Sequence, residues 1–330
     1  MEAADITDNS NNSKTISPGD FLESHARILK IIEQAENIIL GKKDVIQMTV
    51  ISLLCQGHVL IEDVPGVGKT SLVSAFARSI DSSYKRIQFT PDVMPSDITG
   101  FSIFNPKIGD FEYKKGAVLH QFVQADEINR TSSKTQAALL EVMEEHQVTV
   151  DGTTYAAPSP FIVFATQNPA EYVGTFALPE AQLDRFFIRI SLGYPQFEEE
   201  VRIILSRKGE NLVKTLNPVT TADEILAIGR KADEVHLDEK VGSYIVKLIQ
   251  ATRDHPAVSL GASPRASINL AKAGRAWALY NGRDYVIPDD IQKMAVSVIG
   301  HRLTLKREAR FKNLSAYELV GQIVAETQVL

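Results

Sequence analysis

The sequence predicts an α/β domain with a mainly parallel sheet, followed by an all-helical domain. Two observations carry this prediction. Between about residues 58 and 190, short apolar runs alternate with helical segments, which is the pattern of parallel strands joined by helices. Beyond Pro195 the strand-like runs stop and helical periodicity continues. With 330 residues, 44% of them hydrophobic, the chain is long enough for two domains that each bury a core.

The first domain is predicted from its elements in order. Residues 1–20 are polar and poor in large apolar side chains, so we expect a disordered tail. Helical spacing begins at Phe21, and Gly41 separates this helix from a second one over 44–55. A further helix is predicted over 69–80. The predicted strands are 58–62 (HVLIE), 86–89 (RIQF), 122–126 (FVQAD), 161–166 (FIVFAT) and 186–190 (FFIRI).

One segment departs from this alternation. QVTVDGTTY, 147–155, has two β-prone runs around Asp151-Gly152, a strong hairpin signal. We therefore expect a hairpin inserted before the strand over 161–166. The helices of the second domain are predicted over 197–207, 221–235, 238–253, 263–280 and 288–299. The boundary falls at about 193–196, which gives an α/β core over 21–195 and a helical domain over 196–330.

Composition and charge exclude several classes of protein. The net charge is −6, so no global basic field attracts nucleic acid. The single cysteine, Cys55, cannot form an intrachain disulfide, which fits a reducing compartment. The longest apolar run, 45–55, is about half a membrane span, and the amino terminus lacks the features of a signal peptide. We expect a soluble cytoplasmic protein without a membrane partner.

The stretch DVPGVGKT, 63–70, matches most of the phosphate-loop pattern G-x-x-x-x-G-K-[ST]. It follows a predicted strand and opens a predicted helix, which is the context that the pattern requires. Asp63 stands where the pattern has glycine, but Asp tolerates turn conformations better than most residues, so we expect a working site. The alternative is a glycine-rich turn between a strand and a helix. The predicted nucleotide-binding residues are Val64, Pro65, Gly66, Val67, Gly68, Lys69, Thr70 and Ser71.

Two side chains of this loop have particular roles in the prediction. Lys69 would neutralise the β and γ phosphates, and the Thr70 hydroxyl would ligate Mg²⁺. A second motif, FVQADEINR over 122–130, places Asp126 at the end of a strand, suited to holding Mg²⁺ through water. Glu127 follows it and would polarise the attacking water. Gln124 is polar where a buried apolar residue is expected, so it faces a hydrogen-bonding pocket or the strand is off-register.

Asn168 in ATQNP, 165–169, ends another predicted strand. Its uncharged, short side chain could hold the attacking water opposite Glu127, although an Asn-Pro turn is the common reason for this pair. Arg185 in LPEAQLDRFF, 178–187, precedes the last strand. It either pairs with a neighbouring acid or reaches the γ-phosphate of an adjacent subunit.

Arg265 in GASPRAS, 261–267, lies in the first turn of a predicted helix. A cation there opposes the helix dipole, which suggests that it serves something else, plausibly a nucleotide phosphate across the domain cleft. A surface salt bridge is the alternative.

These motifs together resemble the MoxR family of AAA+ ATPases. The order DVPGVGKT, ADEINR, ATQNP, LPEAQLDRF and GASPRA agrees with that family from about Glu23 to the carboxyl terminus. The resemblance implies an AAA+ P-loop NTPase core followed by a helical lid. It also implies the roles of four motifs: Asp126 and Glu127 as Walker B, Asn168 as sensor 1, Arg185 as the arginine finger and Arg265 as sensor 2.

The resemblance also implies a contact with adenine and two insertions. NIILGKK, 37–43, resembles the adenine-contacting stretch, with Ile39 and Gly41 as candidates. QFTPDVMPSDITG, 88–100, with the loop to Val118, resembles the insertion that lines the axial face of a ring. The hairpin at Asp151 resembles the insert before sensor 1. Family members assemble as rings, often hexamers, and act as chaperone-like remodellers with von Willebrand A domain partner proteins.

The predicted function is ATP hydrolysis with Mg²⁺ that drives the remodelling or maturation of a protein client. Two other classes remain open. A nucleotide-binding scaffold that does not hydrolyse would be expected to lack Glu127 or Lys69, and both are present. A nucleic-acid-associated AAA+ motor is disfavoured by the acidic balance of the chain.

Overall fold

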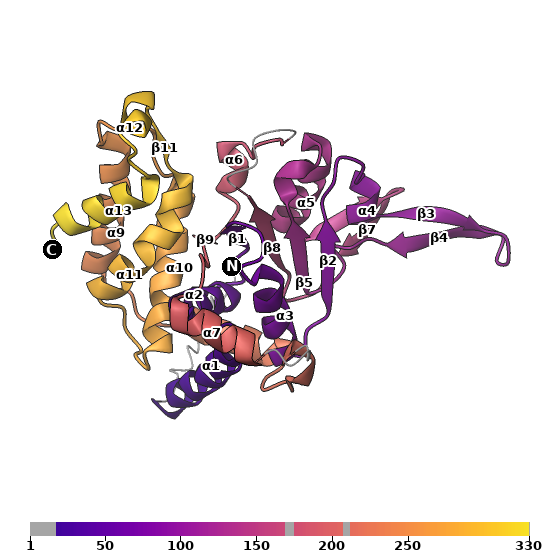
Figure 1. Cartoon of the computed structure of the whole chain (residues 1–330), viewed down its shortest axis with the longest axis horizontal. Helices are drawn as coiled ribbons and strands as arrows, with labels where there is room; N and C mark the ends of the chain where they lie inside the picture. Colours follow the sequence, from indigo (N-terminus) through magenta and orange to yellow (C-terminus); the bar gives the residue numbers. More distant parts are fainter. Residues whose placement is uncertain (1–17, 169–174, 207–211, 330) are drawn as a thin grey trace, which may run out of the picture.

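The computed structural model describes residues 18–168, 175–206 and 212–329 (Figure 1). A five-stranded sheet forms the centre of the α/β core. Its strands lie in the order β2-β5-β8-β1-β9, and every neighbouring pair is parallel. They are β1 (Val59–Glu62), β2 (Tyr84–Gln88), β5 (Phe122–Asp126), β8 (Ile162–Gln167) and β9 (Ile188–Ile190). We call the side where these strands finish the carboxyl end of the sheet, and the opposite side its amino end.

Helices cover both faces of the sheet, as the alternation predicts. Successive side chains of a strand point to opposite faces, so Val59 and Ile61 join one apolar cluster while Leu60 joins the other. The core helices are α1 (Pro18–Ile38), α2 (Lys43–Leu54), α3 (Lys69–Ser79), α4 (Pro95–Thr99), the short η1 (Ile128–Arg130), α5 (Ser133–Glu145) and α6 (Glu180–Leu183). Residues of α1, α2 and α3 pack in the first cluster, and those of α4 and α5 in the second. The predicted tail is helical from Pro18, and its first seventeen residues lie outside the described chain.

Two antiparallel hairpins extend the core. The hairpin of β6 (Gln147–Val150) and β7 (Thr153–Ala156) turns at Asp151-Gly152, where the sequence predicts it. The hairpin of β3 (Gly100–Asn105) and β4 (Asp110–Lys115) lies within the segment that the sequence marks only as an insertion. Figure 1 shows β3 and β4 projecting away from the sheet. Several of their apolar side chains are exposed, Phe104 and Phe111 among them.

The second domain is mainly helical. Its helices are α7 (Phe197–Ser206), η2 (Leu212–Thr215), α8 (Ala222–Asp233), α9 (Glu239–Asp254), α10 (Pro264–Tyr280), α11 (Pro288–Ile299), η3 (Gly300–Arg302), α12 (Arg307–Phe311) and α13 (Ala316–Glu326). Thr221 and Glu224 form a capping box at the start of α8, and Pro288 begins α11. The predicted helices end at residue 299, so the sequence does not predict α12 and α13. It also does not predict a small antiparallel pair of β10 (Val258–Leu260) and β11 (Thr304–Leu305). These two strands are too short to leave a recognisable alternation.

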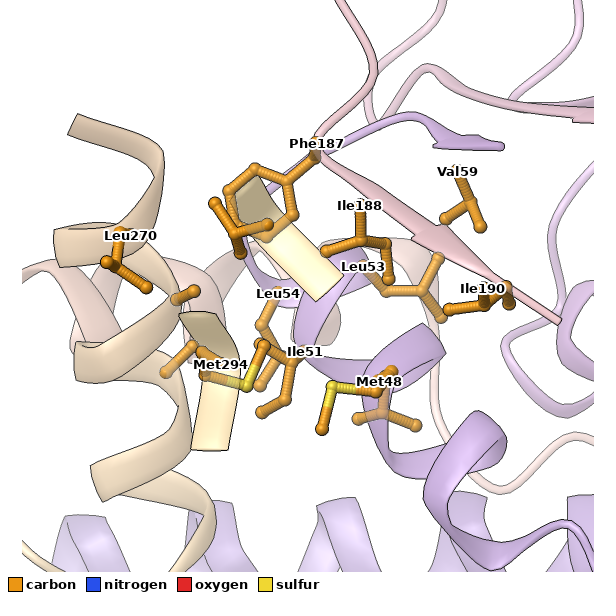
Figure 2. Packing of buried hydrophobic residues seen from close by; sticks show 14 of the residues in the cluster. Met48, Ile51, Leu53, Leu54, Val59, Phe187, Ile188, Ile190, Leu270 and Met294 are labelled. Atoms are coloured by element: carbon orange, nitrogen blue, oxygen red, sulfur yellow. The ribbon is translucent and has the colours of Figure 1, made fainter. Parts of the chain in front are cut away.

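The helical domain packs against α2 and β9. One continuous apolar cluster contains Met48 and Ile51 of α2, Ile188 of β9, Leu270 of α10 and Met294 of α11 (Figure 2). Helix α8 approaches the end of α2 so closely that a Cβ added to Gly229 would lie 2.5 Å from the carbonyl oxygen of Leu54. Packing of the helical domain against α2 therefore sets the position of the lid. Among the described residues, no helix has both the length and the apolar character that a membrane span needs.

Candidate active site

The loop that joins β1 to α3 has the backbone of a phosphate-binding loop. Gly66 and Gly68 adopt φ values of +86° and +99°, a region that glycine enters without the strain of a side chain. Gly68 directly precedes α3, so the loop runs into the amino end of that helix. A Cβ added to Gly66 would have no atom within 4 Å, so the space beside it is open. Backbone N–H groups at such a loop and helix end form a site for phosphate.

The Lys69 ammonium folds back onto this loop. Its Nζ donates to the carbonyl oxygens of Asp63 and Val64, at 2.9 and 3.1 Å. Burial lowers the pKa of Lys69, and the nearby charges of Asp63, Asp126 and Glu127 oppose that shift. The lysine is thus held at the loop by neutral acceptors, which an anionic ligand outcompetes.

Asp126 ends β5 and is almost buried. Its Oδ1 accepts hydrogen bonds from Gln124 Nε2 at 2.7 Å and from Thr166 Oγ1 at 3.3 Å. Its Oδ2 forms an ion pair with Nε of Arg86 on β2, at 2.5 Å. Because both carboxylate oxygens are bound, the side chain is fixed in one orientation beside the phosphate loop.

Gln124 is the residue that fits the sequence pattern badly, and the structure resolves why it is polar. The strand is in register, since β5 pairs with β2 and β8 along its length. The Gln124 side chain is fully buried, and its Nε2 donates to both Thr70 Oγ1 at 2.9 Å and Asp126 Oδ1. Its Oε1 accepts from the hydroxyl of Tyr84 at 2.6 Å. The side-chain amide of Gln124 therefore hydrogen-bonds both predicted metal ligands, the Thr70 hydroxyl and the Asp126 carboxylate.

Glu127 adopts a left-handed backbone, with φ +56° and ψ +49°. Its N–H donates to Thr166 Oγ1 at 2.9 Å, so β8 supports this strained position. The carboxylate accepts from Gln88 Nε2 at 2.8 Å and from Arg130 Nη1 at 2.9 Å. The predicted water-activating group is thus held by two donors at the mouth of the site.

Asn168 follows β8 and is 7% exposed. Strand β8 lies between β5 and β1 in the sheet. The amide is therefore placed between the end of β5, which carries Asp126 and Glu127, and the phosphate loop, which follows β1. The structure brings Lys69, Thr70 and these three residues together at the carboxyl end of the sheet.

The predicted adenine-contacting stretch lies against the same loop. Ile39 is buried, and its Cδ1 would lie 3.7 Å from a Cβ added to Gly68. Gly41 has φ +72°, and a side chain there would collide with the Glu199 carboxylate of α7. Ile39 and Gly41 are therefore placed where the phosphate loop meets the start of the lid.

Arg185 and Arg265 lie at the opposite end of the sheet. Both pair with Glu144, near the end of α5, at 2.9 Å from Arg185 and 2.7 Å from Arg265. Arg185 comes just before β9, where the N–H of Phe187 donates to the carbonyl of His58 ahead of β1. The cluster is therefore at the amino end, and the four residues of β1, about 13 Å of strand, separate it from the phosphate loop.

This placement bears on the prediction for Arg265. The sequence suggests that it reaches a nucleotide phosphate across the domain cleft, but it faces Glu144 at the far end of the sheet from its own phosphate loop. The physical reason is the packing of α10 and α11 in one cluster with α2 and β9, which carries the first turn of α10 to the amino end. The ion pair that the sequence left as the alternative is present.

The donor set at the carboxyl end fits Mg²⁺. That ion prefers hard oxygen ligands and usually keeps several waters, with one or two carboxylates and substrate phosphates completing its shell. The Thr70 hydroxyl and the Asp126 carboxylate are the protein oxygens here, and they share the Gln124 amide as a common donor. The two residues therefore suit a metal that is bound together with a phosphate ligand.

Sequence reasoning missed several polar residues of the site. Arg86 and Gln88 alternate along β2, and they pair in register with Gln124 and Asp126 of β5. Their spacing of two places both on one face, a signal that was present in the predicted strand RIQF. Thr166, near the end of the predicted strand FIVFAT, is a third such residue. The identities of these three residues do not indicate their hydrogen-bond partners, which lie at the end of β5.

Comparisons with known proteins identify the family of both domains. Residues 58–188 match a family model described as the ATPase family associated with various cellular activities (AAA), and residues 250–323 match one described as an AAA lid domain. The chain is 40% identical to the chaperone MoxR1 of Mycobacterium tuberculosis over 89% of this chain and 80% of that protein. It is 49% identical to the uncharacterized protein YeaC of Bacillus subtilis, over 92% and 95%.

A solved structure supports the same fold. The crystal structure of a candidate ATPase from Cytophaga hutchinsonii superposes with a TM-score of 0.87 and 37% identity. The match covers 94% of this chain and 97% of that chain. The α/β core and the helical lid therefore occur together in a related protein.

Proposed function

The chain belongs to the MoxR family of AAA+ ATPases, and from this premise we propose that it hydrolyses ATP with Mg²⁺ to remodel a protein client. The observation that carries the proposal is the arrangement of the two ends of the sheet. Nucleotide-binding groups gather at the carboxyl end, and two arginines suited to stabilising phosphoryl charge gather at the amino end. One subunit thus carries a site and also the groups that would complete another.

Binding begins at the phosphate loop. The N–H groups of residues 66–71 are the donors for the phosphates, and Lys69 transfers its hydrogen bonds from the Asp63 and Val64 carbonyls to the β and γ phosphates. Thr70 and Asp126 would hold Mg²⁺, which would supply positive charge against the phosphate oxygens. Gln124 fixes the relative position of these two ligands.

Hydrolysis then requires a group that orients water. Glu127 is that group. Its carboxylate must replace the hydrogen bonds from Gln88 and Arg130 by one from the water before it can accept a proton. Asn168 lies between Glu127 and the phosphate loop, where its amide holds the water in line with the γ-phosphate. The proton passes to the Glu127 carboxylate as the water attacks, and the bond between the γ-phosphorus and the bridging oxygen breaks.

Arg185 and Arg265 act on the nucleotide of a neighbouring subunit. Their distance from their own phosphate loop supports this assignment, as does their shared, half-exposed partner Glu144. An arginine supplied in this way stabilises the charge of the transferring phosphoryl group. The arrangement supports head-to-tail assembly, because such an interface places each amino end beside the next carboxyl end, and we take the assembly to close into a hexameric ring.

The client is a protein, and a von Willebrand A domain protein acts with the ring in the cytoplasm. Support comes from the family and from a relative whose name describes it as a chaperone. The β3–β4 hairpin adds a surface for contact, since it exposes Phe104 and Phe111 away from the sheet (Figure 1). This is the segment that the family resemblance assigns to the axial face of the ring.

A mixing experiment tests the central step. Lys69→Ala loses its own nucleotide site but keeps both arginines, whereas Arg185→Ala keeps the site and loses the finger. Each variant alone should hydrolyse ATP poorly, by about 1,000- to 100,000-fold for Arg185→Ala. Mixed subunits should regain part of the rate, because some interfaces then join an intact site to an intact arginine. Phosphate release measures the rate, and light scattering measures the size of the ring.

Arg310→Ala is the matched control, because this arginine is exposed on α12. It should hydrolyse at the wild-type rate. If the two impaired variants stay inactive together after subunit exchange has been demonstrated, Arg185 does not act across the interface. If Arg185→Ala alone hydrolyses normally, the arginine is a structural partner of Glu144.

A further inference from the structure

Asp63 stands at the first position of the phosphate loop, where the general pattern has glycine. It is 6% exposed, and it is absent from the residues with positive φ, so a left-handed backbone does not explain it. Its carboxylate is saturated with donors. Oδ2 accepts from the N–H groups of Leu192 at 2.5 Å and Gly193 at 2.8 Å, and from Ser191 Oγ at 3.1 Å. Oδ1 accepts from the N–H of Val64 at 3.1 Å.

The donors come from the segment that joins the core to the lid. Residues 191–193 follow β9 directly and lead into α7, and Gly193 has φ +62°. The next residues lie on the predicted adenine-contacting stretch, since Lys42 Nζ donates to the carbonyl of Tyr194 at 2.7 Å. We call residues 191–196, which lie between β9 and α7, the hinge. It therefore touches both the phosphate loop and the segment that would hold the base.

The same residue also meets Lys69, through its backbone. The Lys69 ammonium donates to the carbonyl oxygen of Asp63 at 2.9 Å. A triphosphate carries several negative charges and attracts the ammonium more strongly than two neutral carbonyls do. Binding of nucleotide thus removes a donor from the peptide group of Asp63 while its carboxylate still holds the hinge.

We propose that Asp63 is a positioning residue that links occupancy of the phosphate loop to the conformation of the hinge and the lid. The inference rests on the proposed ATP-binding function. A glycine at position 63 would preserve the loop and its amides but would have no group to hold Leu192 and Gly193. The Asp63 carboxylate therefore couples the binding of nucleotide at the phosphate loop to the conformation of the hinge.

Asp63→Gly and Asp63→Asn test the link, with amide hydrogen exchange of residues 191–193 as the readout. In the wild type these amides should be protected, and a non-hydrolysable ATP analogue should change their exchange rate. Asp63→Gly should still bind the analogue by calorimetry, lose the protection and lose the response. Its kcat should fall by about tenfold or more with a smaller change in KM, the scale of coupling between two sites.

Asp63→Asn keeps one acceptor oxygen in nearly the same shape, so it should restore part of the protection. Because it is close to isosteric, it also keeps the test valid if the glycine variant does not fold, which thermal unfolding would show. Glu198→Gln is the control, an exposed acid in the first turn of α7 near the hinge. It should leave both exchange and turnover unchanged.

The outcomes separate this inference from the proposed function. If the wild type binds and hydrolyses ATP, and both Asp63 variants keep its nucleotide-dependent exchange at 191–193, the link is overturned alone. If the wild type does not bind the analogue, the proposed function fails and the inference fails with it. Loss of the response with retained binding supports both.

Discussion

The two ends of the central sheet hold their charged groups in different ways. At the carboxyl end, Asp126 is almost buried and Gln124 and Thr166 fix its orientation. At the amino end, Glu144 is shared by Arg185 and Arg265, and the three side chains are 29–46% exposed. Exposed ion pairs contribute little to stability, typically less than about 1 kcal/mol, so these arginines are held weakly. The side chains at the carboxyl end are thus fixed in one arrangement. At the amino end, the two arginines can exchange Glu144 for another anionic group.

The backbone beneath the weakly held arginines is nonetheless firmly fixed. Arg302 of the lid is buried, and its guanidinium donates to Asp184 Oδ1 at 2.8 Å and to the carbonyl of Phe187 at 3.2 Å. His301 Nε2 lies 3.1 Å from the carbonyl of Phe186. The lid thus anchors the segment around Arg185 while leaving its charged tip available. The difference teaches that rigidity at the amino end fixes the backbone, whereas at the carboxyl end it also fixes the side chains that we propose to act in hydrolysis.

Of the substitutions that compare the two ends of the sheet, the largest effect is expected at Glu127, at the carboxyl end. Glu127→Gln keeps the size of the side chain and its ability to accept hydrogen bonds, but it cannot take a proton from water. We expect ATP binding to persist and turnover to fall by about 100- to 10,000-fold, the scale of general-base effects. Calorimetry and steady-state phosphate release measure the two quantities. A near wild-type rate would contradict the role of Glu127 and would remove the functional distinction of the carboxyl end.

A smaller effect is expected at the amino end, from His58. Its neutral ring is fixed by geometry, since Nδ1 accepts from the N–H of Val163 at 3.1 Å and Nε2 donates to the carbonyl of Met143 at 3.0 Å. Burial lowers the pKa of His58 from 6.5 to about 4, with a contribution from the nearby His146. The unfolded chain therefore binds a proton before the folded one does as the pH falls.

The sign follows from this order of protonation. The stabilising effect of neutral His58 is complete above about pH 6.5 and is lost as the pH falls toward 4, by on the order of 3 kcal/mol. His58→Gln can keep both hydrogen bonds and does not titrate, so it should lose less stability between pH 7 and 4.5. Urea unfolding at the two pH values measures this. His120→Gln, at a partly buried histidine elsewhere, is the control, and an unchanged pH dependence in His58→Gln would contradict the assignment.

Much of the carboxyl end could be predicted from the sequence. The ends of parallel strands meet at one side of a sheet, so the positions of Lys69, Asp126 and Asn168 follow once their strands are recognised. The hairpin at Asp151 followed from its turn pair in the same local way. In each case the information lies within a few residues of the feature, or in a general rule of sheet topology.

The remainder depends on contacts between distant segments. Gln124 looked out of place because its three partners, Tyr84, Thr70 and Asp126, are visible only in the folded sheet. Asp63 was interpreted as a turn residue because its donors lie about 130 positions away in the chain. Arg265 was expected near its own nucleotide, since no local pattern says against which side of the core the lid packs.

The smallest effect is expected from Glu144, at the amino end of the sheet. Glu144→Gln removes the charge that Arg185 and Arg265 share but keeps one acceptor oxygen. In the wild type, the hydrogen bond from Arg265 lowers the pKa of the Glu144 carboxyl group. Because the pair is half-exposed, the free energy of unfolding should change by less than about 1 kcal/mol. Turnover of the assembled protein should be kept or raised, since both arginines become easier to transfer to a neighbouring phosphate. Glu141→Gln, one turn earlier on α5 and exposed, is the matched control and should change neither quantity. A loss of turnover as large as that of Glu127→Gln would show that Glu144 holds the arginines in their working position, and the two ends of the sheet would then be equally preorganised.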